Sequence, residues 1–337
     1  MHNEANTTVT PNQPISIVEQ RLAVPLESCD VSNRSKLESY RALYRKWMKW
    51  YESSPNNPNT IEGQIISMMF HDLTYRCITS IRSSLPSEEQ ISARSSTLAY
   101  IIDSGYLANQ VLAISKLTDD RSDVVSVLRL VKDVGSNREF ITREVYVAGF
   151  GDPYDPEAWR KEHDESDLMI QMWGLRDPRL FRWLLSHYAH EQFDALSGVS
   201  PEQRSRDDMV PPVIFRRLIE WLSIPEIKEL KNLRDNFLAH AGDALRRGEQ
   251  NIMRSVRFDQ VDKAQKAIIR AERAITDCLL SIGIGREVIA APPLGIFSCL
   301  DIPYSTMAGQ DEMHALWDKL KTERESWKLN ILQELAQ

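Results

Sequence analysis

An arginine and a histidine six residues apart, Arg234 and His240, are the pair in this sequence best suited to act on a phosphate group. They lie in the segment 225–242, whose apolar residues recur with the period of an amphipathic helix. At about 100° per residue, Arg234 falls inside the apolar arc and His240 falls at its edge. A guanidinium on an apolar face is costly unless it is paired or used. An arginine can clamp a phosphate there, and a histidine can transfer protons near neutral pH.

A structural explanation of the same pair stays open. An arginine can be buried against a carboxylate, and a histidine near a helix C-terminus is favoured by the helix dipole. If the pair binds a phosphate instead, Asn236, one turn before His240, can orient its imidazole ring.

The segment Arg234–His240, with the sequence RDNFLAH, resembles the Arg…His motif of the HEPN superfamily, in which a polar residue follows the arginine. Two further stretches are similar to the AbiU-type abortive-infection branch of that superfamily. These are Tyr40–Tyr51, and Ile114–Asp119 followed by Val125–Leu128. The resemblance extends from about residue 34 to residue 283, and Lys116 stands where an arginine is expected.

This resemblance implies a dimeric helical bundle that cleaves RNA without a metal, at a composite site built from both copies. RNA supplies its own nucleophile, the 2′-OH. His240 would then act as acid and base, and Arg234 would hold the scissile phosphate. Asp235 would orient one of them, with Asn236 as a helper. A dimer interface would explain why Arg234 faces an apolar surface.

The resemblance further implies an endoribonuclease of a bacterial phage-defence or toxin–antitoxin type system, with RNA as substrate. The expected assembly is a homodimer, with an antitoxin or defence protein as a further partner and with neither cofactor nor metal. The alternative is a non-catalytic HEPN-like helical module that binds RNA, a nucleotide or a partner protein. In that case Arg234 and His240 would hold a ligand or only the interface.

Four cations recur on one face of the helix expected after the motif, which suggests a track for a phosphate backbone. They are Lys263, Lys266, Arg270 and Arg273. A solvated helix face is the other explanation of the pattern.

The overall charge argues against broad coating of nucleic acid, because 41 Lys and Arg stand against 48 Asp and Glu, a net charge of −7. The segment 241–276 differs, since its 8 basic and 5 acidic residues give +3. The sequence therefore leaves room for a narrow site with a few placed cations.

An all-α fold is expected, because helical periodicity dominates and Gly (13) and Pro (16) are too few for a turn-rich β fold. We expect a weakly ordered segment 1–30, a HEPN-like helical bundle over 31–285 with a central insertion at about 149–208, and a C-terminal extension 286–337 ending in a helix. No apolar run is long enough to span a bilayer and no secretory signal is evident, so we expect a cytoplasmic protein without membrane contact.

Several helices can be assigned more closely. The stripe of Tyr40, Tyr44, Trp47 and Tyr51 predicts an aromatic face in the core or at an interface rather than a base-stacking platform. A helix over about 95–117 is expected to bury a stripe that includes Ile101 and Leu112, and 311–335 is expected to form one final helix. His187, His190 and Glu191 predict a polar helix face rather than a metal site, for which His163 and Asp164 would be the nearest further ligands.

Overall fold

The computed structural model of the chain describes residues 17–53, 57, 59–86, 97–162, 178–238, 256–282, 287–289 and 307–337. Within these ranges the regular elements are helices, and one isolated antiparallel bridge joins Thr142 to Met209. The all-α class is therefore confirmed for the described chain, while a HEPN-like bundle stays a prediction. No helix among these residues is long and apolar enough to cross a membrane.

The described chain is a succession of helices and helical turns. The α-helices are α1 (Ile17–Leu22), α2 (Arg34–Tyr51), α3 (Ile61–Ser84), α5 (Thr97–Leu117), α6 (Val127–Ser136), α7 (Arg143–Ala148), α8 (Pro156–Glu162), α10 (Pro178–Ser197), α11 (Pro212–Trp221), α12 (Pro225–Leu233), α15 (Phe258–Arg273), α16 (Met307–Ser326) and α17 (Ile331–Ala336). The 3-10 turns are η1 (Leu26–Ser28), η2 (Arg138–Phe140) and η3 (Pro201–Gln203). The π-helical turns are η4 (Arg234–Leu238) and η5 (Ala274–Leu279).

The aromatic stripe of α2 lies in the core. Asn33 caps the helix by accepting a hydrogen bond from the backbone N–H of Lys36. The indole of Trp47 is fully buried and donates to Asp133 of α6 at 2.6 Å, which satisfies its only polar atom. The four predicted aromatic residues are all at most 1% exposed, so the predicted core face is confirmed: Tyr40, Tyr44, Trp47 and Tyr51.

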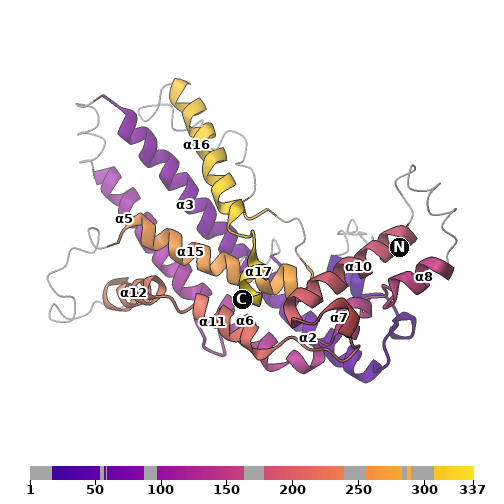
Figure 1. The fold of residues 1–337 in the computed structure, drawn as a ribbon. Helices are drawn as coiled ribbons and strands as arrows, with labels where there is room; N and C mark the ends of the chain where they lie inside the picture. Colours follow the sequence, from indigo (N-terminus) through magenta and orange to yellow (C-terminus); the bar gives the residue numbers. More distant parts are fainter. Residues whose placement is uncertain are drawn as a thin grey trace, which may run out of the picture.

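The long helices α3, α5 and α16 run along one arm of the molecule, with α15 crossing them (Figure 1). The predicted buried stripe of α5 is wrong, because Ile101 is 58% and Leu112 is 38% exposed. The buried face instead includes Gln110, whose amide donates to the carbonyl of Met68 and accepts from Gln265. Since α5 is apolar on most sides, this buried polar contact selects the face that turns inward.

The C-terminal extension packs on the bundle through a buried charge cluster. Arg324 of α16 is fully buried, and one of its nitrogens lies 3.1 Å from Asp72 of α3 and 2.9 Å from Asp262 of α15. Burial raises the pKa of Asp262, against the opposing charges of Arg76 and Arg324. The predicted single helix over 311–335 is wrong, since α16 ends at residue 326 and α17 begins after Asn330, whose φ is 61°.

The segment expected as an insertion supplies part of the core. Its helix α10 packs on α7, and Phe193 is fully buried. Arg143 of α7 joins the two helices, lying 2.6 Å from Asp194 and 2.8 Å from Asp208. Residues 149–208 therefore contain a helix on which the neighbouring fold depends, whatever the further role of the segment.

Candidate functional site

The Arg234 segment departs from regular helix at the arginine itself. α12 ends at Leu233, and Arg234 begins the π-helical turn η4, which packs against α5. A π turn inserts extra chain into a helix and changes the direction of the following side chains, and such turns are frequent at functional sites. His240 lies outside the described residues, so its predicted approach to Arg234 stays a prediction.

Arg234 is half-buried and paired with its own neighbour. Its side chain is 24% exposed, with Nε 2.7 Å and Nη2 2.6 Å from Oδ1 of Asp235. The carboxylate of Asp235 is 52% exposed. Asn236 is partly exposed in the same turn. Arg234 is therefore partly accessible to solvent, and its ion pair with Asp235 fixes the position of its guanidinium.

The predicted cation stripe on α15 is largely occupied by ion pairs within the chain. Lys263 lies 2.9 Å from Glu226, and Arg270 pairs with Glu334 of α17. Arg273 is only 6% exposed. Lys266 is exposed and forms no ion pair within the part of the chain that the structure describes. These four residues do not present a continuous row of free charges.

Arg273 belongs to a buried cluster rather than to a surface. Its guanidinium lies 3.4 Å from Glu272 and 3.5 Å from Asp277. Burial raises the pKa of both carboxyl groups, against the lowering effect of the Arg273 charge. The hydroxyl of Tyr51 donates to Glu272 at 2.8 Å. This environment favours a structural role for the most C-terminal cation of the stripe.

The histidines of α10 have different environments. His190 is buried, its Nε2 lies 2.7 Å from the carbonyl oxygen of Tyr154, and burial lowers its pKa. His187 lies 3.4 Å from Glu191 at the surface. His163 and Asp164 lie outside the described residues. Among the residues that the structure does describe, no group of three His, Cys, Asp or Glu side chains could hold a metal ion.

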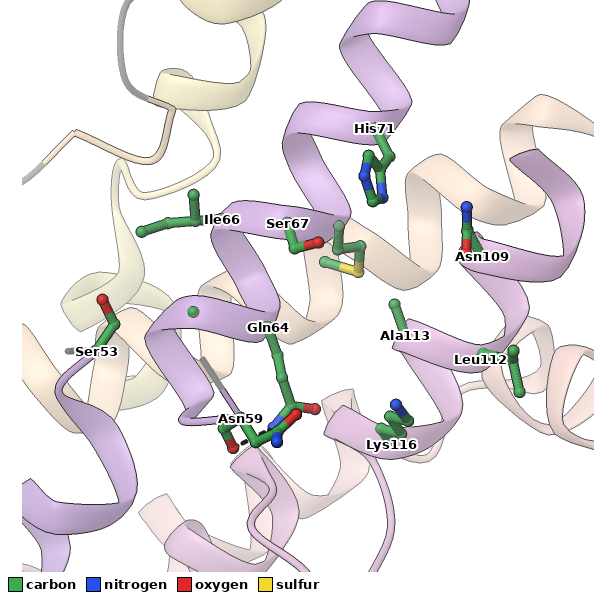
Figure 2. Close-up of a pocket in the computed structure, with 12 residues that line it drawn as sticks. Ser53, Asn59, Gln64, Ile66, Ser67, His71, Asn109, Leu112, Ala113 and Lys116 are labelled. Atoms are coloured by element: carbon green, nitrogen blue, oxygen red, sulfur yellow. Dashed lines mark hydrogen bonds between the residues drawn. The ribbon is translucent and has the colours of Figure 1, made fainter. Parts of the chain in front are cut away.

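A groove between α3 and α5 is a site that sequence patterns did not reveal. Its volume is about 650 Å³, and Figure 2 shows the side chains that surround it. Lys116 and Asn109 of α5 face Gln64 and His71 of α3 across the opening. The exposed Leu112 belongs to the stripe predicted to lie in the core, and this wrong assignment concealed the groove. The available signal was Lys116, the one basic residue of the largely apolar helix α5.

Comparisons with known proteins identify no relative. A scan against protein-family models, a search of curated proteins and a search of solved structures each return no match for this chain.

Proposed function

We propose that this chain is a metal-independent endoribonuclease whose site contains Arg234 and His240, in a homodimer that brings both pairs together. The observation that supports the proposal is the π turn η4, which starts at Arg234, whose side chain remains 24% exposed. An arginine in a helix needs no such turn to form an ion pair with solvent-exposed Asp235. A turn of this kind can instead direct the guanidinium towards a ligand.

The proposed reaction uses the 2′-OH of RNA. His240 accepts the proton of this hydroxyl while its oxygen forms a bond to the adjacent phosphorus. The bond from phosphorus to the 5′-oxygen breaks, and a protonated histidine, His240 of the second copy, returns a proton to that oxygen. Arg234 stabilises the charge on the phosphate. The products are a 2′,3′-cyclic phosphate and a 5′-hydroxyl, which balance the reaction without a cofactor.

The test is cleavage of single-stranded RNA by the full chain in excess chelator. We expect products with 2′,3′-cyclic phosphate ends, and a loss of at least about a hundredfold in rate in Arg234→Ala and in His240→Ala. Lys319→Gln is the matched control, because Lys319 is an exposed cation on α16. Unchanged cleavage by the Arg234 and His240 variants, or no cleavage by the wild type, would contradict the proposal.

The second candidate is a non-catalytic helical module that binds RNA, a nucleotide or a partner protein. The ion pairs of Lys263 and Arg270 favour its nucleotide-binding and partner-binding forms, because they leave fewer cations for a long RNA track. RNA binding without cleavage in the same assay would support this alternative. A defence or toxin role, with an antitoxin or defence protein as partner, belongs to the first proposal and depends on cleavage.

A further inference from the structure

The groove between α3 and α5 has an unusual charge composition for an acidic chain. None of the described residues that line it is Asp or Glu, although the chain as a whole carries a net charge of −7. Its charged or titratable lining residues are Lys116 and His71. A concave site with a cation and no carboxylate favours an anionic ligand over a cationic one.

Polar side chains converge at the Lys116 end. Lys116 is exposed and forms no ion pair with any residue that the structure describes. Gln64 is fixed there, because its Nε2 donates to the carbonyls of Asn59 at 3.0 Å and Val125 at 3.2 Å. Its buried Oε1 has no hydrogen-bond partner among the described atoms. This end therefore offers the positive charge of Lys116, while the Gln64 amide, whose Oε1 is buried, forms the wall beside it and donates nothing to a ligand.

The opposite end and the floor have a different character. His71 and Asn109 lie at the other end of the opening (Figure 2). Between the two ends, Ser67 supplies a hydroxyl group and Ala113 supplies apolar surface (Figure 2). A ligand that spans the groove would place its charge at one end and neutral hydrogen-bonding groups at the other.

We propose that this groove binds a small phosphate monoester, with the phosphate at Lys116 and a hydroxyl-bearing organic part extending towards Asn109 and His71. The volume of about 650 Å³ lies within the range typical of small-molecule sites. A nucleoside monophosphate and a sugar phosphate share this chemistry. The inference does not rest on RNA cleavage, because neither Arg234 nor Asp235 lines the groove.

The experiment is calorimetric titration of the full chain with AMP and with glucose 6-phosphate. Adenosine, glucose and inorganic phosphate are the matched ligands that lack one half of each probe. We expect one monoester to bind at least about tenfold more tightly than its dephosphorylated form and than inorganic phosphate. Tighter binding of AMP would identify the ligand as a nucleoside monophosphate, and tighter binding of glucose 6-phosphate would identify it as a sugar phosphate.

Variants then assign the two ends of the groove. Lys116→Gln should remove the difference between the monoester and its dephosphorylated form, whereas Asn109→Ala should weaken both by a similar factor. Lys319→Gln should leave all affinities unchanged. The proposal is overturned if neither monoester binds more tightly than its matched ligands, or if Lys116→Gln keeps the full preference for phosphate. RNA cleavage by the same preparations reports separately on Arg234 and His240.

Discussion

The α7–α10 region and the α5–α12 region lie at opposite sides of the molecule (Figure 1). They differ in how deeply an arginine is buried and in how many partners it has. Arg143 of α7 is fully buried and bonded to Asp194, Asp208 and Ser197. Arg234, next to α12, is partly exposed and bonded to its neighbour Asp235. Burying a charge is costly unless an opposite charge pairs with it. Incomplete pairing at the surface leaves a charge able to exchange its partner for a ligand.

Other buried charged groups in and beside the α7–α10 region also have hydrogen-bond partners. Glu144 is buried and accepts hydrogen bonds from Ser32 and Arg206. Arg41 is buried and donates to the carbonyl of Gly149 at 2.8 Å. By contrast, Lys116 in the α5 groove is exposed and has no such partner in the described chain. The contrast separates charges that stabilise the fold from charges that are available for binding.

The largest expected effect is the loss of Arg143. Arg143→Met leaves the carboxylate of Asp208 without its arginine and that of Asp194 with Arg204 alone, and we expect a loss of about 3 kcal/mol in the free energy of unfolding. Urea unfolding measures it. Arg121→Met is the control, because Arg121 is 67% exposed in its pair with Asp119 and should cost at most about 1 kcal/mol. Equal losses in the free energy of unfolding for the two substitutions would contradict the distinction between buried and exposed arginines.

A buried arginine in the other arm tests whether burial, rather than region, is decisive. Arg324→Met should weaken the packing of α16 by about 2–3 kcal/mol, because it leaves Asp72 and Asp262 without this partner. Hydrogen exchange of the α16 amides measures the local opening. Lys319→Met on the same helix should leave the protection unchanged. Unchanged protection in the Arg324 variant would show that apolar packing alone holds α16.

A smaller effect is expected from Asp152, at the edge of the α7–α10 region. Burial raises its pKa to about 6, against the lowering charges of Arg21 and Arg182. Because the folded-state pKa lies above the unfolded value of about 3.9, the contribution of Asp152 to stability should be lost as the pH rises from about 4 to 6. Asp152→Asn should lack this loss, which we expect to be about 1–2 kcal/mol after allowance for solvent screening. Parallel stability curves for both proteins would contradict this assignment.

Sequence periodicity predicts the helices better than it predicts the faces that they bury. The stripe of α2 was predictable because its large aromatic residues alternate with charged ones, which leaves one possible core face. The helix α5 offers apolar residues on most sides, so Gln110 and its partners decide its rotation. These partners belong to α3 and α15, so the contact of Gln110 with them cannot be predicted from the sequence of α5 alone.

The candidate sites show a similar division. The sequence identifies Arg234 as unusual, but its nearest partner depends on the π turn that begins there. Arg143 carries no sequence signal of its role, because its partners Asp194 and Asp208 are 51 and 65 residues away. The groove at Lys116 forms only where α3 and α5 pack together, so neither helix predicts it alone. Chemistry-bearing residues can thus be recognised locally, whereas their pairing requires the tertiary fold.

The smallest expected effect is on stability in Arg234→Met. The pair of Arg234 and Asp235 is partly exposed, and an ion pair within reach of solvent contributes at most about 1 kcal/mol, because water and salt screen it and both side chains lose freedom in forming it. Urea unfolding of this variant should therefore match that of the Arg121→Met control. RNA cleavage should be lost in the Arg234 variant and retained in the Arg121 variant. A loss as large as that of Arg143→Met would make Arg234 a structural residue and would explain its position on an apolar face without any ligand. Near-unchanged stability together with lost cleavage would instead require that the chain keeps this arginine for its chemistry.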